Sequence, residues 1–298
     1  MKEYLDILKY VALEGVKKDD RTNTGVSSVF GMGYTIDLQK GFPLLTTKKV
    51  HIKSIIHELL WFISGSTDVK DLQRHGVTIW DEWADENGQL PETYSKQWSR
   101  YEDMRAVSFQ EYQDKLNFFL GGGFETIGVD HSKELIFTRR EINQVTKLID
   151  GIRSNPNGRR HILNGWNVST VDEAALPPCH VLYQFNVTNG KLSCLFYMRS
   201  NDLFLGHPFN IASAAFLTHM IAQQCGLEVG NLTWIGGDVH IYDNHLTKDI
   251  VFEQLAREPR QLPKLTLLHR NDIRDYCFDD FKIEEYDPHP SISAPVAV

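Results

Sequence analysis

The segment Leu176–His180, with the sequence LPPCH, runs directly into the apolar stretch Val181–Val187. A proline fixes its φ near about −65° and lacks an amide donor, so two in succession predict a stiff, non-helical turn. The apolar stretch has the length and the content of β-branched and aromatic residues that are typical of a buried strand. We therefore expect Cys179 to lie in a turn at the mouth of a β-sheet.

These residues leave the role of Cys179 open. Free cysteine is among the most buried residue types and commonly packs as a small apolar side chain. A cysteine becomes a nucleophile only where nearby positive charge stabilises its thiolate. The other cysteines, Cys194, Cys225 and Cys277, form no C-x-x-C pair with it or with each other. Reduced thiols and no structural zinc are expected.

The composition is that of an ordinary globular protein. The chain has 298 residues, of which 42% are hydrophobic and 23% charged, and a net charge of −8. No apolar run approaches the roughly 18 residues of a membrane span, and Met1–Tyr10 lacks the apolar core of a signal peptide, so we expect a cytoplasmic protein. The negative charge makes nucleic acid an unlikely partner, so an anionic ligand must be small and bound by clustered arginines.

The hydrophobic pattern mixes helices with strands, which indicates an α/β fold. The stretch Phe209–Gly226 is apolar on nearly all sides and is expected to be a buried helix, and Asn189-Gly190 predicts a hairpin. We expect a mobile loop at Lys17–Gly25, and a helix end with a flexible connection at Gly121–Gly123. Other helices are predicted at Tyr4–Gly15, Ile52–Ile63 and Glu141–Ile152, and strands at Val26–Leu38, His161–Trp166, Val181–Val187, Leu192–Tyr197 and Leu232–Ile241.

One carboxylate and several aromatic residues stand out from this pattern. Glu58 lies inside an apolar helix, where it either occupies the wet face or is buried with a raised pKa. Trp80 and Trp83 are three residues apart, and Tyr94 follows in a second aromatic cluster. Dense aromatic residues most often form a core, but they also form stacking platforms for planar rings.

These motifs together resemble the thymidylate synthase family. The resemblance covers nearly the whole chain except about residues 101–141, a segment that looks like an insertion into a catalytic domain spanning 1–298. The matching blocks are Arg21-Thr22, Gly41–Leu44, Ile55–Phe62, Trp80–Ala84, Arg159-Arg160, Leu176–His180, Arg199–Asp202, Phe209–Ser213, Gly237–Tyr242 and Tyr286–Pro290.

The resemblance implies a single α/β domain on a mixed β-sheet flanked by helices, with a homodimer formed through the sheet. It implies a methyltransferase of nucleotide biosynthesis that needs no metal. Its substrate is deoxyuridine monophosphate (dUMP), and its co-substrate is 5,10-methylenetetrahydrofolate. The one-carbon unit is transferred to C5 of the pyrimidine and reduced, which gives thymidylate (dTMP) and dihydrofolate.

The resemblance assigns Cys179 as the nucleophile. Addition of a thiolate at C6 makes C5 of the pyrimidine reactive, and positive charge from Arg199 stabilises that thiolate. The phosphate is bound by Arg21, Arg199 and Ser200, while Arg159-Arg160 reach in from the other subunit. Without the resemblance, Arg159-Arg160 fit a solvated turn better.

Base and sugar recognition follow in the same way. The amide of Asn210 offers a donor and an acceptor, which suit O4 and N3 of uracil, whereas a carboxylate would suit cytosine. His240 and Tyr242 correspond to the pair that binds the sugar 3′-hydroxyl. From the residues alone, they are equally an interior histidine and tyrosine in a strand.

The resemblance also assigns the proton transfers and the folate site. Glu58 is a buried proton shuttle, which needs a raised pKa, and Tyr94 and His180 order water near C5. Asp202 hydrogen-bonds the pterin, and the C-terminal residues close over the folate and exclude water. The folate residues are Lys48 and His51 near its tail, with Trp80, Trp83, Leu176, Asp202, Gly206, Phe209, Ala297 and Val298 around its ring.

Three residues depart from the family pattern. Met198 stands where a glutamine is usual, His207 occupies an apolar position near the folate, and Ser95 replaces a glycine. All three are expected to change the water structure of the site. The alternative reaction is therefore dUMP 5-hydroxymethylation, in which water adds to the methylene and tetrahydrofolate is released.

Two further hypotheses belong to other classes of protein. A cysteine–histidine hydrolase would pair Cys179 with a histidine base, but adjacent residues on a strand point to opposite faces. A non-catalytic nucleotide or messenger-RNA binder is the other hypothesis, and the acidic composition disfavours it.

Overall fold

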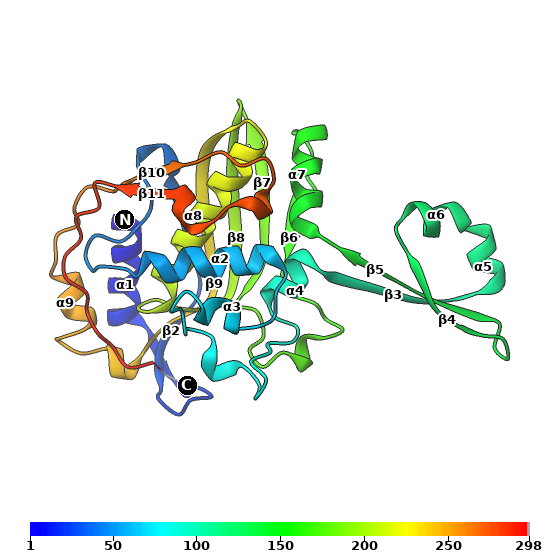
Figure 1. Cartoon of the computed structure of the whole chain (residues 1–298). Coiled ribbons are helices and arrows are strands. Elements are labelled where there is room, and N and C mark those ends of the chain that lie inside the picture. Colours follow the sequence, from blue (N-terminus) through cyan, green and yellow to red (C-terminus); the bar gives the residue numbers. More distant parts are fainter. Residues whose placement is uncertain (297–298) are drawn as a thin grey trace.

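A six-stranded sheet forms the centre of the molecule, in the strand order β1-β2-β9-β8-β7-β6 (Figure 1). The structure is a computed structural model, and it describes residues 1–296. The β8 and β9 strands pair in parallel and the other neighbours are antiparallel, so the sheet is mixed, as expected. Its strands are β1 (Val16–Lys18), β2 (Val26–Asp37), β6 (Ile162–Asn164), β7 (His180–Thr188), β8 (Lys191–Asp202) and β9 (Glu228–Tyr242).

The long helix α8 (Gly206–Gln224) is the crossover that a parallel β8–β9 pair requires. It contacts β8, β9 and α2, and its side chains are buried on nearly every side, which confirms the prediction from its composition. The other helices are α1 (Lys2–Glu14), α2 (Ile52–Ser64), α3 (Lys70–Gln73), α4 (Tyr94–Ser99), α5 (Phe109–Asp114), α6 (Leu116–Gly121), α7 (Gln144–Ser154) and α9 (Val251–Leu255).

The short helix α4 is fixed by aromatic packing against α2 and the sheet. The ring of Tyr94 lies 4.8 Å from that of Phe62 on α2, and Trp98 meets Tyr183 of β7 edge-on at 5.4 Å. Both Tyr94 and Trp98 are almost fully buried. Edge-to-face and tilted pairs of this kind add to the energy of burial, so the orientation of α4 is well defined.

Residues Tyr101–Ile142 form an arm that projects from the body of the molecule (Figure 1). Three antiparallel strands, in the order β3-β5-β4, carry α5 and α6, and Val107, Phe119 and Phe124 form a small separate core. The sequence predicted a helix end near Gly121, where α6 ends, but none of the three strands. They are β3 (Tyr101–Ser108), β4 (Glu125–Asp130) and β5 (Leu135–Ile142).

Several predicted boundaries were wrong. The helix expected from Glu141 begins at Gln144, because Glu141 still pairs with Glu102 in the arm. The stretch expected to be a mobile loop starts with the edge strand β1. The strand expected to end at Tyr197 continues to Asp202, since its polar residues pair with β9 up to His240. Pairing within the sheet overrides the low strand propensity of these residues.

The C-terminal segment is bound along the body. A short antiparallel pair, β10 (Lys264–Leu267) with β11 (Phe281–Glu284), precedes it. The Tyr286 hydroxyl donates to the carbonyl of Leu45 at 2.8 Å, and a ring nitrogen of His245 lies 2.7 Å from the carbonyl of Pro295. The predicted folate residues Ala297 and Val298 lie outside the described residues. Within 1–296, no helix has both the length and the apolar character needed to cross a bilayer.

Candidate active site

Cys179 lies just before β7, outside any helix or strand, as the two prolines predict. Its peptide N–H donates to the hydroxyl oxygen of Tyr94 at 2.5 Å, and its carbonyl accepts the N–H of Arg199 at 3.0 Å. The thiol is thus held between α4 on one side and β8 on the other. Two segments distant in sequence fix its position.

The guanidinium of Arg199 is bound to the turn that carries the thiol. Its Nε donates to the carbonyl of Pro178 at 2.9 Å and its Nη2 to the carbonyl of Pro177 at 2.6 Å. The group also lies 5.6 Å from the ring of Trp166. A planar guanidinium can make two such bonds at once, so its orientation is more firmly fixed than that of an ammonium group would be.

These surroundings act on the thiol in opposite directions. Burial raises the pKa of Cys179, while Arg199, the Tyr94 hydroxyl and Arg21 each lower it. The net shift is upward in the free protein.

The two other residues near the turn are engaged inside the protein. The Tyr94 hydroxyl oxygen also accepts the N–H of His180, at 3.3 Å. The His180 ring is buried, its Nδ1 lies 3.0 Å from the hydroxyl of Tyr183, and burial lowers its pKa to about 4. His180 is consequently neutral and paired with its own strand, which argues against a cysteine–histidine hydrolase.

Glu58 is half-buried, and its carboxylate faces the indole of Trp80, so the structure favours the buried alternative over the wet face of the helix. The indole Nε1 of Trp80 donates to its Oε1 at 2.7 Å. Burial raises the pKa of Glu58 to about 7, against the opposing effect of the Trp80 hydrogen bond. A carboxyl with this pKa can both donate and accept a proton at neutral pH.

Aromatic and apolar side chains continue from Trp80 toward the surface. Trp80 is 7% exposed and meets Trp83 edge-on at 5.7 Å. Trp83, Leu176 and Phe209 are half-buried and pack against the same core. Solvent exposure therefore increases across these four predicted folate residues, from the buried Trp80 to the half-buried Trp83, Leu176 and Phe209.

The polar residues at the ends of β8 and β9 gather beside the thiol. Arg21, in the turn between β1 and β2, is exposed and lowers the pKa of both Cys179 and Tyr242. Burial is the larger effect on Tyr242 and raises its pKa to about 12. His240 Nδ1 lies 3.1 Å from the Asp238 carboxylate, and this hydrogen bond holds the pKa of Asp238 well below its usual range. Ser200 pairs with Asp238 across the strands.

The sequence did not single out Asn201, which is 1% exposed on β8. Its Nδ2 lies 3.4 Å from Asn210 Oδ1 and 3.3 Å from the sulfur of Met198, while its Oδ1 has no partner within residues 1–296. Its place in the matching block Arg199–Asp202, between two predicted site residues, was the available signal. The predicted base-recognition residue Asn210 therefore has a second amide behind it.

A sequence model described as thymidylate synthase matches residues 2–298. This chain belongs to the thymidylate synthase family. The match includes the arm, and it indicates a one-carbon transferase of dTMP biosynthesis, with dUMP as the small-molecule substrate and methylenetetrahydrofolate as the co-substrate. That the arm is an insertion into this family's fold stays a prediction.

Two of the predicted folate residues, Asp202 and Lys48, form hydrogen bonds to backbone groups of the protein. Asp202 Oδ1 accepts the N–H groups of Phe204 at 2.9 Å and Leu205 at 3.3 Å, next to Gly206 at the start of α8. Lys48 is 6% exposed, bonds the carbonyl of Phe204 and lies 3.4 Å from its ring centre. Burial lowers the pKa of Lys48 to about 7, which Asp202 opposes. Lys48 thus faces the interior.

Other predicted residues of the family lie at the surface. His51 is exposed at the start of α2, with Nδ1 2.7 Å from the hydroxyl of Ser54. Arg159 and Arg160 are exposed on the turn after α7. Their role in a neighbouring subunit stays a prediction.

Two of the three departures from the family pattern do not reach the site directly, contrary to expectation. His207 is fully buried, its ring is stacked on Tyr4 at 5.5 Å, and Nε2 lies 2.5 Å from the Tyr34 hydroxyl. Burial lowers its pKa to about 3, so it is a neutral core residue. Ser95 is also buried, and its hydroxyl donates to the carbonyl of Ser66.

No group of three or more His, Cys, Asp or Glu side chains within 1–296 is arranged to hold a metal ion. All four cysteines of the chain are free thiols.

Proposed function

We propose that this protein converts dUMP and 5,10-methylenetetrahydrofolate into dTMP and dihydrofolate. The observation that carries the proposal is the pairing of two reactive groups in this site. Cys179 is held between Tyr94 and Arg199, and Glu58 has a pKa of about 7 beside Trp80. A thiol nucleophile and a carboxyl that exchanges protons near neutrality are the two groups that this reaction requires.

Cys179 forms a bond to C6 of the pyrimidine, and the C5–C6 electron pair moves toward O4. Glu58 delivers a proton toward O4 through water and later accepts it back. C5 then bonds to the one-carbon unit as one of its two bonds to folate nitrogen breaks. The proton on C5 leaves to water near Tyr94, and the second carbon–nitrogen bond breaks as an exocyclic methylene forms on the pyrimidine. The folate supplies both the carbon and the hydride that reduces it, and expulsion of Cys179 from C6 restores the ring.

Nucleotide recognition is assigned to the polar ends of β8 and β9. Arg21, Arg199 and Ser200 bind the phosphate, for which guanidinium groups provide paired donors. The Asp238 carboxylate accepts from Nδ1 of His240, which leaves Nε2 as an acceptor for the sugar hydroxyl. Tyr242 completes that contact.

Asn210 binds the pyrimidine edge, with Asn201 holding its amide. The half-buried Trp83, Leu176 and Phe209 cover the pterin ring, together with Trp80 and the C-terminal Val298. Asp202 is a further pterin ligand in this proposal. Its second oxygen remains for that bond, while Oδ1 accepts the N–H groups of Phe204 and Leu205 in the turn before α8.

A cytoplasmic homodimer is part of the proposal. Large apolar side chains are exposed on strands of the central sheet, with Phe30 83% and Ile162 44% exposed. Apolar groups so placed are typical of a surface that another chain covers. A partner over this sheet would bring its own Arg159 and Arg160 toward the phosphate.

Hydroxymethylation of dUMP is the second candidate, and one observation favours it. The sulfur of Met198 lies 3.3 Å from Asn201 Nδ2, and Asn201 Oδ1 has no hydrogen-bond partner in the described chain. The hydrogen-bond network behind the base therefore lacks one polar side chain. Such a gap changes where water is held near the methylene.

Product analysis separates these possibilities. The purified protein is incubated with dUMP and 5,10-methylenetetrahydrofolate, and both products are identified by mass spectrometry. We expect dTMP with dihydrofolate, while hydroxymethyl-dUMP with tetrahydrofolate would establish the second candidate. The Cys179→Ser variant serves as the control and should form neither. Unchanged nucleotide turnover by that variant would return the choice to another class of enzyme, and no turnover by the intact protein would favour a nucleotide or RNA binder.

A further inference from the structure

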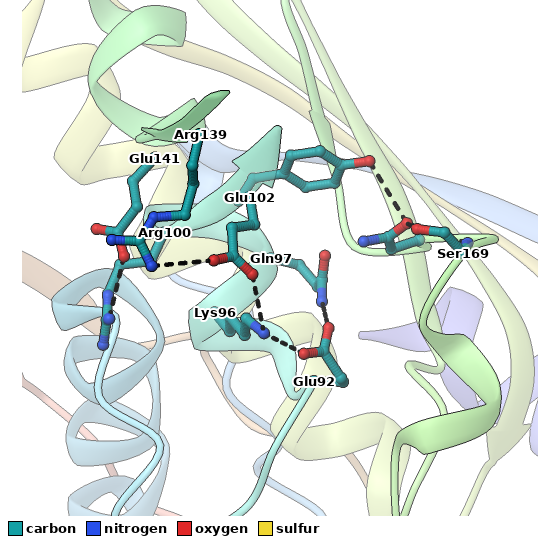
Figure 2. Close-up of polar contacts among 10 residues, drawn as sticks. Glu92, Lys96, Gln97, Arg100, Glu102, Arg139, Glu141 and Ser169 are labelled. Carbon is teal, nitrogen blue, oxygen red and sulfur yellow. Dashed lines mark hydrogen bonds and ion pairs between the residues drawn. The ribbon is translucent and has the colours of Figure 1, made fainter. Parts of the chain in front are cut away.

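A pocket of about 280 Å³ lies where the arm meets the body, and it shares no lining residue with the candidate active site. Its walls come from the end of α4, the start of β3 and the loop at 167–170 (Figure 2). The lining residues are Glu92, Lys96, Gln97, Tyr101, Glu102, Asp103, Met104, Asn167, Ser169 and Thr170.

The floor of this junction pocket contains a buried amide with an unused acceptor. Gln97 is 2% exposed, and its Nε2 donates to Glu92 Oε2 at 2.9 Å. Its Oε1 has no hydrogen-bond partner within residues 1–296. Figure 2 shows this oxygen on the side of the amide turned away from Glu92. A buried carbonyl without a donor is unfavourable, so the position suits a ligand that brings an N–H group.

Among the side chains that line the pocket, carboxylates outnumber cations by three to one. Glu92 is 5% exposed, and its Oε1 is bonded to the ammonium of Lys96. The same ammonium lies 3.9 Å from Glu102, which also has Arg139 at 3.6 Å (Figure 2). Asp103 is already satisfied by bonds from two arginines of the arm. Lys96 is thus the one cation among the lining residues, and its ammonium is divided between Glu92 and the more distant Glu102. This excess of negative charge in the lining favours a cationic ligand.

The remaining wall is flat and partly apolar. Tyr101 lines the pocket, and its hydroxyl lies 3.4 Å from Asn167 Oδ1. The side chain of Met104 is 60% exposed at the rim. An aromatic face next to carboxylates suits a planar cation, because both stacking and cation–π attraction are available.

We infer that the junction pocket binds a small planar organic cation of the amidinium or guanidinium class. Its N–H groups donate to Gln97 Oε1 and to Glu102, and its flat side lies against Tyr101. Such cations are more weakly hydrated than an ammonium and carry several N–H donors in one plane, so they can satisfy both acceptors together.

The test uses benzamidine as the probe with the full-length protein, titrated by saturation-transfer NMR. We expect saturable binding with a dissociation constant on the order of 1 mM, which is reasonable for a ligand of about nine non-hydrogen atoms. Benzoate has the same ring with the opposite charge, and it should show no saturation at tenfold higher concentration. Absence of saturable benzamidine binding, or equal binding of benzoate, would overturn the inference.

Variants locate the binding. Glu102→Gln should weaken benzamidine binding about fivefold, as expected for one partly exposed charged hydrogen bond. The matched control is Glu141→Gln, the same change at an ion pair with Arg100 (3.1 Å) that does not line the pocket, and it should leave binding unchanged. Equal effects of the two variants would contradict the proposed site.

The buried acceptor is tested separately. Gln97→Met keeps the length of the side chain and removes the free carbonyl, and binding should weaken at least fivefold. Because this variant also loses the bond to Glu92, Tyr101→Ala provides a second measurement at the less buried wall. Benzamidine binding that survives both Gln97→Met and Tyr101→Ala would overturn the inference.

Discussion

The titration of Glu58 offers the most direct test of the site. Burial raises the pKa of this carboxyl from its ordinary value of 4.5 to about 7, although Trp80 donates a hydrogen bond to it. The variant Glu58→Gln keeps the shape and the acceptor oxygen but cannot ionise. Its stability should therefore lack the pH dependence that Glu58 gives to the natural protein.

The sign follows from proton linkage. Between pH 4.5 and about 7 the folded protein keeps a proton on Glu58 that the unfolded chain has released. The stabilising effect of the neutral carboxyl is thus complete below pH 4.5 and is lost as the pH rises through 7. A pKa difference of this size corresponds to about 3 kcal/mol. The free energy of unfolding of Glu58→Gln, relative to the natural protein, should rise by about 2.5 kcal/mol between pH 5 and pH 8.

Urea unfolding followed by tryptophan fluorescence measures this difference at pH 5, 6, 7 and 8. The protein concentration is held fixed, because association would change the apparent stability. Glu82→Gln, at an exposed carboxylate near Trp80, is the matched control and should give a pH-independent difference. A pH-independent difference for Glu58→Gln as well would refute the account of Glu58 as a proton carrier. Turnover by Glu58→Gln should also fall about 100-fold or more.

Three further predictions concern the thiol turn and the arm. Tyr94→Phe removes the acceptor of the Cys179 and His180 N–H groups and should cost about 2 kcal/mol of unfolding free energy by urea titration, where no loss would contradict the buried bonds. Arg199→Gln should slow alkylation of Cys179 by iodoacetamide at neutral pH, because the thiolate loses its strongest stabilising charge, and an unchanged rate would disprove that role. Phe119→Ala should cost the arm about 3 kcal/mol, measured as faster amide hydrogen exchange from residues 101–142 only. Equal loss of protection in the central sheet would show that the arm does not have an independent core.

Local sequence was sufficient where one segment determines its own structure. The two prolines predicted the turn at Cys179, and the uniform apolar composition after Phe209 predicted a buried helix. Motif matching paired Arg199 with Cys179, and the structure has the Arg199 guanidinium on the turn that carries the thiol. In each of these cases the information lies within a few residues along the chain.

Partners distant in sequence account for what was missed. Lys48 was predicted to lie near the folate tail, and nothing in the sequence indicated that Phe204, 156 residues away, binds its ammonium through a carbonyl and a ring. His207 was expected near the folate, but its ring is buried in the core, where it stacks on Tyr4 and hydrogen-bonds the Tyr34 hydroxyl. Apolar and polar residues alternate only weakly along the arm strands, because these strands pair with each other in a small sheet that is partly exposed. No pattern within one segment specifies such contacts.

The two prolines at the thiol turn perform a task beyond limiting its flexibility. Neither has an N–H group to satisfy, yet both carbonyls remain free as acceptors, and the guanidinium of Arg199 bonds to both. The N–H of Arg199 then binds the carbonyl of Cys179 itself, so the stiff turn and the charged strand residue orient each other. The Tyr94 hydroxyl fixes the opposite side of the same residue through its N–H. The position of the thiol therefore depends on the side chains of Arg199 and Tyr94 as well as on backbone groups. A substitution at either residue should change the placement of Cys179 together with its reactivity.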